Sequence, residues 1–353
     1  MVQCTSLEPA CEGTLSTGHV LDPPGTGIDG PAVVFHLGSA PPVRLDQKGP
    51  ASYNKTMHTP EQLVIRPPSE ARSLLVRTVR GCNWNRCLFC GIYDLFGTPH
   101  STRELDDVLR DIDSLRDLHH DVFRTAFLGD ADPLNLPTEF LVEVLTHLRK
   151  TFPSLERVTA YGRASSLWKK SPQELKDISA AGLDRVHVGM ESGSDLVLRF
   201  QKKGTSARQL IEAGQNTMDS GMELSYYFLL GLGGREMWKD HVAGSITVIN
   251  EVAPHFVRVR RLWIHPASRL MEKVTTGEFT EQTPEGTVIE LRDLLAGLKA
   301  DRTYFTCDHA NNYLQVAGLL GTERQKMLEE ITSFLALPSD RREAYYRSIP
   351  SVI

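Results

Sequence analysis

The residues best suited to chemistry are three cysteines, Cys82, Cys87 and Cys90. They have the spacing C-x4-C-x2-C, directly follow the apolar run at 74–79, and are half of the six cysteines in the chain. Thiolates this close in sequence can converge on one soft metal centre, because a short loop can wrap round an ion or cluster while the preceding strand fixes its direction. Three thiolates leave one coordination position open.

The open position favours an iron–sulfur cluster over a zinc ion. A structural zinc normally has four protein ligands, and no second Cys/His pair at zinc-finger spacing follows in the sequence. Two alternatives remain: three buried thiols in a tight turn, and a zinc ion whose fourth ligand is a distant histidine.

The composition is that of an ordinary globular protein, with 353 residues of which 41% are hydrophobic and 24% charged. The formal charge of −5 argues against a general electrostatic attraction to nucleic acid or to an anionic membrane. The sequence has neither a run of about 18 apolar residues nor a signal-peptide pattern. We therefore expect a cytoplasmic protein with no membrane partner, in a reducing compartment where clustered thiols indicate metal binding or catalysis.

The distribution of glycine and proline and the periodicity of apolar residues divide the chain into three predicted regions: a loop-rich N-terminal extension at 1–65, an α/β domain at 66–270, and a mainly helical C-terminal extension at 271–353. The first region is rich in Gly and Pro, and only 32–37 resembles a strand. Its cysteines, Cys4 and Cys11, are expected to be incidental.

From residue 74 onward, apolar runs alternate with amphipathic stretches. Strands are predicted at 74–79, 125–129, 157–161, 185–190, 224–230 and 256–264. Helices are predicted near 102–117, 138–151, 172–181, 206–220, 236–252, 284–300 and 322–336. Crossovers of this length imply a parallel sheet covered by helices, which can curl into a partial barrel. Periodicity alone equally allows a doubly wound open sheet or an eight-fold barrel.

Polar residues and glycines follow several of these strands, and ligands of parallel barrels lie at the C-terminal ends of the strands. Each such residue also has an ordinary structural explanation, as part of a turn or a solvated surface. The candidates are Gly129, Asp130 and Asp132 after the second strand, Arg163 after the third, Glu191 and Ser192 after the fourth with Lys203 further on, and Gly231 and Gly233 after the fifth.

The sixth strand is unusually basic. By alternation, Arg258 and Arg260 share one face while Arg261 shares the other with Trp263 and His265. A buried Arg is costly without an anion, so the inward set is a candidate for binding an anionic group. A polar cluster follows the barrel and is either substrate-facing or structural: Asp308, His309, Asn312 and Tyr313.

The cysteine loop, with Phe89 before its last cysteine, and the segment Gly-Met-Glu-Ser-Gly-Ser at 189–194 resemble the radical S-adenosylmethionine (SAM) superfamily. The chain is most similar to its elongator and coproporphyrinogen-oxidase-like branch, from about residue 65 to residue 337. The first cysteine gap is one residue longer than the usual C-x3-C-x2-C. The resemblance implies a partial (β/α)6 barrel, a 4Fe-4S cluster held by the three cysteines, and SAM chelated to the open iron.

The resemblance also implies roles for single residues. Asp130 stands where the family usually has a Glu that holds the SAM amino group, Glu191 and Lys203 would approach the amino acid part of SAM, and the glycines at 231 and 233 would let the backbone approach its adenine. The implied SAM-binding residues are Phe89, Gly129, Asp130, Arg163, Glu191, Ser192, Lys203, Gly231 and Gly233. The implied catalytic or substrate-binding residues are Arg258, Asp308, His309, Asn312 and Tyr313.

The expected activity is reductive cleavage of SAM followed by hydrogen abstraction from a small, anionic substrate, with an electron donor such as flavodoxin or ferredoxin. Two alternatives are a non-enzymatic zinc-binding interaction module and a radical SAM enzyme that modifies RNA. The acidic charge and the lack of a recognisable RNA-binding domain argue against the second alternative. No Asp-x-His-x-x-Gly cobalamin signature precedes the core, which argues against a cobalamin-dependent methylase.

Overall fold

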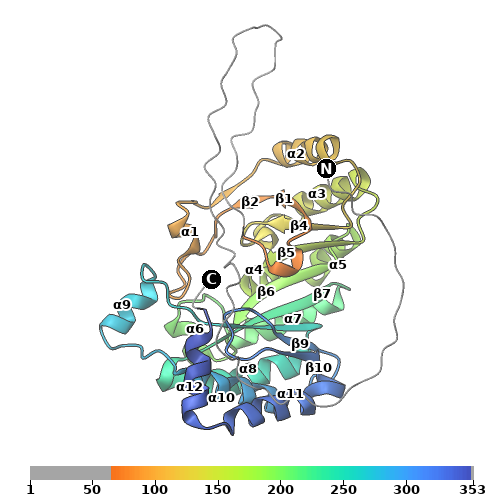
Figure 1. Cartoon of the computed structure of the whole chain (residues 1–353). Helices are drawn as coiled ribbons and strands as arrows, with labels where there is room; N and C mark the ends of the chain where they lie inside the picture. The colour runs from red at the N-terminus through yellow and green to blue at the C-terminus, as the bar shows by residue number, and fades with distance from the viewer. Residues whose placement is uncertain (1–64, 351–353) are drawn as a thin grey trace, which may run out of the picture. The chain divides into compact units, whose positions relative to one another are not determined.

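The computed structural model describes residues 65–350. The strand predicted at 32–37 and the residues Cys4 and Cys11 lie outside this range. The architecture is α/β, with one large sheet and helices packed along one of its faces (Figure 1).

The large sheet confirms the predicted parallel strands. Its order is β1 (Leu74–Arg77), β4 (Thr125–Gly129), β5 (Arg157–Gly162), β6 (Arg185–Glu191), β7 (Glu223–Leu230), β8 (Phe256–Arg261), β9 (Tyr304–Cys307) and β10 (Val316–Leu319). Neighbours from β1 to β9 pair in parallel, and β10 pairs antiparallel to β9. This is the mostly parallel sheet of a partial barrel. A separate hairpin of β2 (Val79–Arg80) and β3 (Ser101–Thr102) leads into and out of the cysteine loop.

The helices predicted from periodicity are also confirmed. They are α2 (Leu105–His119), α3 (Thr138–Thr151), α5 (Pro172–Ala180), α7 (Ala207–Asp219), α8 (Gly234–Val252), α10 (Pro284–Gly297) and α11 (Leu320–Leu335). Short elements that sequence reasoning did not define are α1 (Ile92–Leu95), α4 (Ala164–Lys169), α6 (Asp195–Phe200), α9 (Arg269–Thr275), α12 (Ser339–Ser348) and the 3-10 turns η1 (Pro68–Glu70) and η2 (Pro133–Asn135). The predicted capping box at Ser171 and Glu174 is present at the start of α5.

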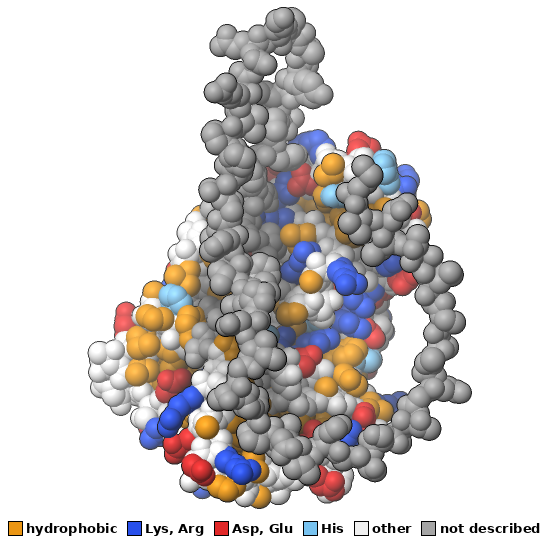
Figure 2. Space-filling view, viewed as in Figure 1, with side chains coloured by type: hydrophobic (Ala, Val, Ile, Leu, Met, Phe, Trp, Pro, Cys, Tyr) orange, Lys and Arg blue, Asp and Glu red, His pale blue; other side chains and the backbone are white. Residues whose placement is uncertain are grey.

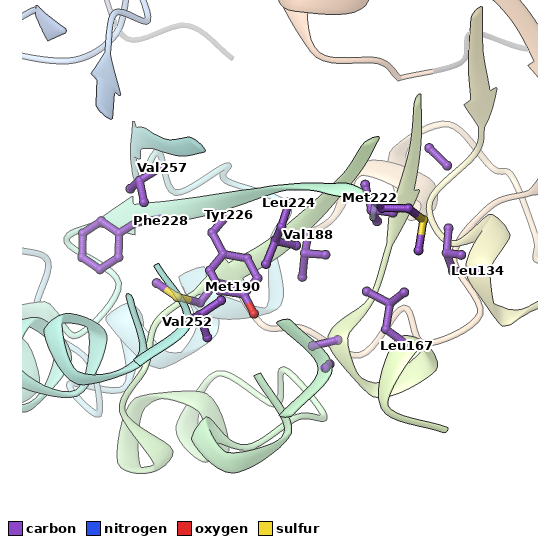
Figure 3. Close-up of a cluster of buried hydrophobic side chains, with 14 of the residues drawn as sticks. Leu134, Leu167, Val188, Met190, Met222, Leu224, Tyr226, Phe228, Val252 and Val257 are labelled. Atoms are coloured by element: carbon purple, nitrogen blue, oxygen red, sulfur yellow. The ribbon is translucent and has the colours of Figure 1, made fainter. Parts of the chain in front are cut away.

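The apolar core lies between the sheet and the helices. Alternation along β6 and β7 sends Val188, Met190, Leu224, Tyr226 and Phe228 to this face, where all are buried (Figure 3). The consequence is that the residues between them point to the opposite face, which is the interior of the partial barrel.

The interior face is polar. At the end of the sheet where the strands begin, the fully buried Glu70 of η1 is hydrogen-bonded to Ser73 at 2.6 Å and lies 3.4 Å from Arg157 and 3.5 Å from His187. Burial alone would raise the pKa of Glu70, but the bonds from His187 and Ser73 and the charge of Arg157 lower it to about 2. This carboxylate therefore remains charged and closes the N-terminal end of the interior.

The sheet continues beyond the boundary that the sequence suggested at residue 270, since β9 and β10 belong to the region predicted as the C-terminal extension. The limits of the three predicted regions remain predictions. Within residues 65–350, none of the helices combines the length and apolar character needed to cross a bilayer.

Candidate active site

The three cysteines lie in the loop between β2 and α1, and their thiols are free and partly buried. The backbone N–H of Asn85 donates to Cys82 Sγ at 3.4 Å, and the N–H of Ile92, the first residue of α1, donates to Cys90 Sγ. Such N–H···S bonds stabilise negative charge on sulfur and tune iron–sulfur clusters. The loop thus supplies sulfur donors that already have outer hydrogen bonds.

Burial and the neighbouring cation Lys203 act in opposite directions on the pKa values of the Cys87 and Cys90 thiols. Burial raises the pKa of Cys87, while the nearby cation of Lys203 lowers it and Cys82 raises it. Burial likewise raises the pKa of Cys90 to about 11. The thiols interact electrostatically with one another and with Lys203, so this donor set fits a cluster that deprotonates all three on binding. Among the described residues, no three Cys, His, Asp or Glu side chains are gathered tightly enough to hold a single metal ion.

The extra residue in the first cysteine gap is accommodated by separate anchors for the residues between the thiols. Asn83 Nδ2 donates to Asp132 Oδ2 at 2.9 Å, and Trp84 Nε1 donates to the carbonyl oxygen of Lys202 at 2.7 Å. Asn85 has a φ of 39°, in the left-handed region that Asn adopts more readily than most residues. The longer loop is therefore held by side chains rather than left loose.

Trp84 connects this loop to the segment that follows β6. Its ring lies 5.2 Å from the guanidinium of Arg86 and 4.9 Å from that of Arg163. A Cβ at Gly204 would come within 2.4 Å of the ring, so the indole packs directly on this glycine. Arg163 also donates to the carbonyl oxygen of Lys203 at 3.1 Å. The predicted residue Arg163 thus supports the loop and the Lys203 backbone.

The other side of the loop is held by α9. Arg269 donates to the carbonyl oxygen of Asn85 at 2.6 Å and to Asp94 at 2.7 Å. The N–H of Leu270 donates to the carbonyl oxygen of Leu88 at 2.9 Å, in the segment between the second and third cysteines. The cysteine loop is therefore fixed on two sides.

The acids after β4 bind the start of the cysteine loop. Asp130 is fully buried and accepts from Arg77 at 2.7 Å and from the N–H of Gly81, the residue before Cys82, at 2.9 Å. Its predicted contact with SAM remains a prediction, and its observed partners give it a role in positioning the loop. The carbonyl oxygen of Gly129 accepts from the N–H of Thr78 at 2.7 Å.

Asp132 joins three elements. Besides Asn83, its carboxylate accepts from the hydroxyl of Ser166 at 2.6 Å and from the N–H of Arg163 at 2.9 Å. Burial raises the pKa of Asp132, against the lowering effect of these bonds. The acid therefore ties the cysteine loop to the C-terminal end of β5.

The end of β6 brings three predicted residues together. Glu191, which has a φ of 63°, forms an ion pair with Lys203 at 3.1 Å, and Lys203 Nζ lies 5.7 Å from the centre of the Phe89 ring. Burial would lower the pKa of Lys203, but Glu191 and Cys87 outweigh it and raise the pKa above its usual value. A carboxylate and an ammonium group therefore stand next to the cysteine loop.

Ser192 points elsewhere. Its hydroxyl is fully buried, accepts from the N–H of Ser194 at 3.1 Å and is hydrogen-bonded to His241 of α8 at 2.8 Å. Burial lowers the pKa of His241 to about 4, so this pair is neutral. The observed contacts of Ser192 are those of a residue that fixes the β6–α6 turn, and its predicted role in cofactor binding remains a prediction.

The glycines after β7 form a turn that α10 supports. Gly231 has a φ of 81°, and its N–H donates to Glu290 Oε2 at 2.7 Å. Gly233 precedes α8, and a Cβ there would lie 2.9 Å from the backbone of Met237. Glu290 also accepts from Gln282 at 2.9 Å, and burial raises the pKa of Glu290 to about 7. Sequence reasoning missed Glu290, which carries no signal beyond its place in a helix.

The basic strand β8 divides its arginines between two environments. Arg258 faces the interior, where its Nε donates to the hydroxyl of Ser225 at 3.2 Å. Arg261 donates to the carbonyl oxygen of Asn311 at 2.6 Å and to the hydroxyl of Tyr313 at 2.8 Å.

The polar cluster after β9 lies beside β8. Asp308 lies 3.5 Å from Arg260, and Asn312, which is buried, donates to the carbonyl oxygen of Val259 at 3.0 Å. His309 is hydrogen-bonded to Asn311. These contacts, with that of Tyr313, brace β8, and the predicted substrate contacts of the cluster remain predictions.

The fold and the residues at the C-terminal ends of its strands together indicate the class of protein. A partial parallel barrel carries a three-cysteine loop, an acid–lysine pair and a glycine turn at one end of its strands, which is where a metal cluster and a nucleotide-like cofactor would meet. Residues 76–243 match the family model described as the radical SAM superfamily. This match identifies residues 76–243 as a radical SAM domain, and the enzymes of that superfamily use a 4Fe-4S cluster and SAM as cofactors.

Relatives of diverse activity are similar to parts of the chain. The 4'-phospho-dehydrooxetanocin synthase of Priestia megaterium is 24% identical over 202 residues, which cover 51% of this chain and 26% of the synthase. The tRNA uridine(34) acetyltransferase of Methanocaldococcus infernus is 27% identical over 110 residues, covering 31% of this chain and 21% of that enzyme. The chain thus spans well under half the length of these curated relatives.

A solved structure has the same fold. The radical S-adenosylmethionine methyltransferase TsrM from Kitasatospora setae, with a tryptophan substrate and a SAM analog bound, aligns with a TM-score of 0.50 at 17% identity. The alignment covers 75% of this chain and 63% of that one. At this identity the likeness concerns the fold alone.

Proposed function

We propose that this protein is a radical SAM enzyme that cleaves SAM reductively and abstracts a hydrogen atom from a small anionic substrate inside the barrel. The observation that carries the proposal is the convergence of the cysteine loop with the Glu191–Lys203 ion pair, two elements more than a hundred residues apart. A 4Fe-4S cluster held by Cys82, Cys87 and Cys90 would supply the single electron that reductive cleavage of the sulfur–carbon bond of SAM requires.

The chain's own residues perform binding and orientation. Cys82, Cys87 and Cys90 hold the cluster, and the ion pair provides both charges needed for the amino acid end of SAM. Glu191 accepts from its ammonium group, and Lys203 binds its carboxylate. The charged form of Lys203 is favoured because Glu191 and Cys87 raise its pKa.

The glycine turn after β7 provides room for the flat adenine. Gly231 has no Cβ and is held in a left-handed conformation by the bond of its N–H to Glu290. The polar interior below this turn holds the substrate, and its enclosure by the strands excludes water from the reacting carbon.

A second candidate is a radical SAM enzyme that modifies RNA. The similarity to a tRNA uridine(34) acetyltransferase favours this alternative, while the formal charge of −5 opposes it. Binding of tRNA that weakens steeply with added salt would support it. For either reaction we propose a small electron-transfer protein such as flavodoxin or ferredoxin as the reductant.

The proposal is tested on anaerobically reconstituted protein. We expect about one cluster per chain by iron and sulfide analysis, visible absorption that is lost in the triple Cys82→Ala, Cys87→Ala, Cys90→Ala variant, and 5'-deoxyadenosine on reduction with SAM. Cys307→Ala is the matched control, because Cys307, the last residue of β9, is buried in the core and its replacement should leave the absorption unchanged. One zinc per chain without iron would instead support a zinc-binding module, and absence of 5'-deoxyadenosine would refute the enzyme proposal.

A further inference from the structure

Three polar residues stand side by side on the interior face of neighbouring strands. Tyr227 of β7 is the register partner of Arg258 of β8, and Arg258 is the register partner of Thr306 of β9. Register partners in a parallel sheet point to the same face. Val257 and Phe305, which alternate with them, are buried in the core on the other face. Arg258 therefore has a hydroxyl-bearing residue beside it on each neighbouring strand, on the same face of the sheet.

Arg258 has no carboxylate within ion-pair distance among residues 65–350. Its contacts are the hydroxyl of Ser225 and the ring of Phe256, 5.4 Å from the guanidinium. Four other cations of the sheet and its loops are each paired with a carboxylate: Arg157 with Glu70, Arg185 with Glu223, Lys203 with Glu191 and Arg260 with Asp308. A partly buried guanidinium without a counter-charge is costly, and an anion would remove this cost.

The two hydroxyls beside Arg258 are also unsatisfied. Tyr227 Oη and Thr306 Oγ1 are both shielded from solvent, and neither has a hydrogen-bond partner in the part of the chain that the structure describes. A buried hydroxyl left unpaired costs roughly 1–3 kcal/mol. A carboxylate or phosphate accepts hydrogen bonds from hydroxyl and guanidinium donors, and these two unpaired hydroxyls belong to the residues next to Arg258 on the adjoining strands.

The position suits a substrate. Tyr227 is the register partner of Gly189, two residues before Glu191 on β6, and it interacts electrostatically with Glu191, Arg258 and Arg260. The three residues therefore lie nearer the N-terminal ends of the strands than the Glu191–Lys203 ion pair. The space-filling view shows Lys and Arg side chains gathered over the middle of the parallel strands (Figure 2). The interior face therefore presents positive charge below the cofactor end.

We propose that Tyr227, Arg258 and Thr306 form an anion site that binds the carboxylate or phosphate group of the substrate. This inference rests on the proposed function, because binding of the substrate's anionic group would position the reacting carbon next to SAM. Arg258 supplies the charge and two N–H donors, Ser225 orients it through Nε, and the hydroxyls of Tyr227 and Thr306 complete the set of donors.

The test measures anion binding by thermal unfolding of the cluster-loaded protein with SAM. Inorganic phosphate and succinate are titrated separately against sodium chloride of equal ionic strength, so that the two arms distinguish a phosphate from a carboxylate. We expect a saturable increase in Tm with one of them. Arg258→Gln should weaken that binding about 100-fold, the loss expected for a charge-assisted contact. Tyr227→Phe should weaken it about tenfold.

Controls separate this site from general effects. Arg124→Gln removes a surface arginine whose side chain is 68% exposed and should bind the anion like the unaltered protein. If Arg258→Gln fails to fold, Tyr227→Phe decides the question, because it removes only a hydroxyl that has no partner. An absent Tm response to both anions, or equal affinities in all variants, would overturn the proposal. The formation of 5'-deoxyadenosine by the unaltered protein is judged separately, so each proposal can fail alone.

Discussion

Replacement of Glu290 by Gln should remove a pH dependence of stability that burial of this acid creates. The Glu290 side chain is fully buried, and burial raises its pKa from 4.5 to about 7. Between these two values the folded protein keeps a proton that the unfolded chain releases, so the wild-type free energy of unfolding falls as the pH rises through this range. At about 1.4 kcal/mol per pH unit, the loss amounts to about 3 kcal/mol and is complete above pH 7.

The assay is urea unfolding of both proteins at pH 5 and at pH 8. The other titrating groups are the same in the two proteins, so their effects cancel in the comparison. Between pH 5 and pH 8 the free energy of unfolding should therefore fall by about 2–3 kcal/mol more in the wild-type protein than in Glu290→Gln. Glu285→Gln, an exposed acid on the same helix, controls for the change of residue type. Equal losses in the wild-type protein and Glu290→Gln would mean that the buried acid is ionised throughout, which would refute the argument from burial.

Two further predictions concern packing, one at the cysteine loop and one where the turn after β6 meets α8. Trp84→Ala removes one hydrogen bond and two cation–π contacts, which together stabilise the loop by about 2–3 kcal/mol. The cluster should therefore lose iron to a chelator faster in Trp84→Ala than in the wild-type protein, with Trp84→Phe intermediate. Equal rates of iron loss in the three proteins would contradict this prediction. Gly193→Ala places a Cβ 2.3 Å from the carbonyl oxygen of Gly244 and should lower the free energy of unfolding by about 1–3 kcal/mol. Gly91→Ala, whose Cβ would lie 3.8 Å from Ser268, is its control and should cost much less.

The strands that could be predicted from sequence are those with a clear apolar signal. The strand at 125–129 was predicted with the bounds that the structure has, because a buried parallel strand is a nearly continuous apolar run. The strands β9 and β10 have only four residues each and no periodicity that distinguishes them from loop. The start of α5 at Ser171 was readable because a capping box is a local signal.

Site residues could be predicted from sequence only where they belong to a local motif. The cysteine spacing identified the loop, and the resemblance indicated Glu191 and Lys203, which the structure pairs. The contact between Trp84 and Lys202 spans 118 residues, and that between Gly231 and Glu290 spans 59. Such contacts depend on how elements pack, which no local pattern records.

Two parts of the chain, one inside and one outside the family match, contribute to the same sheet. The part that matches the radical SAM family ends at residue 243 and contains the cysteines, Glu191 and Lys203. The wall formed by β8 and β9 comes later in sequence, yet it extends the same sheet through direct pairing of β7 with β8. Substitutions on the interior face of β8 and β9 would therefore change the wall of the interior while leaving the cysteines, Glu191 and Lys203 in place.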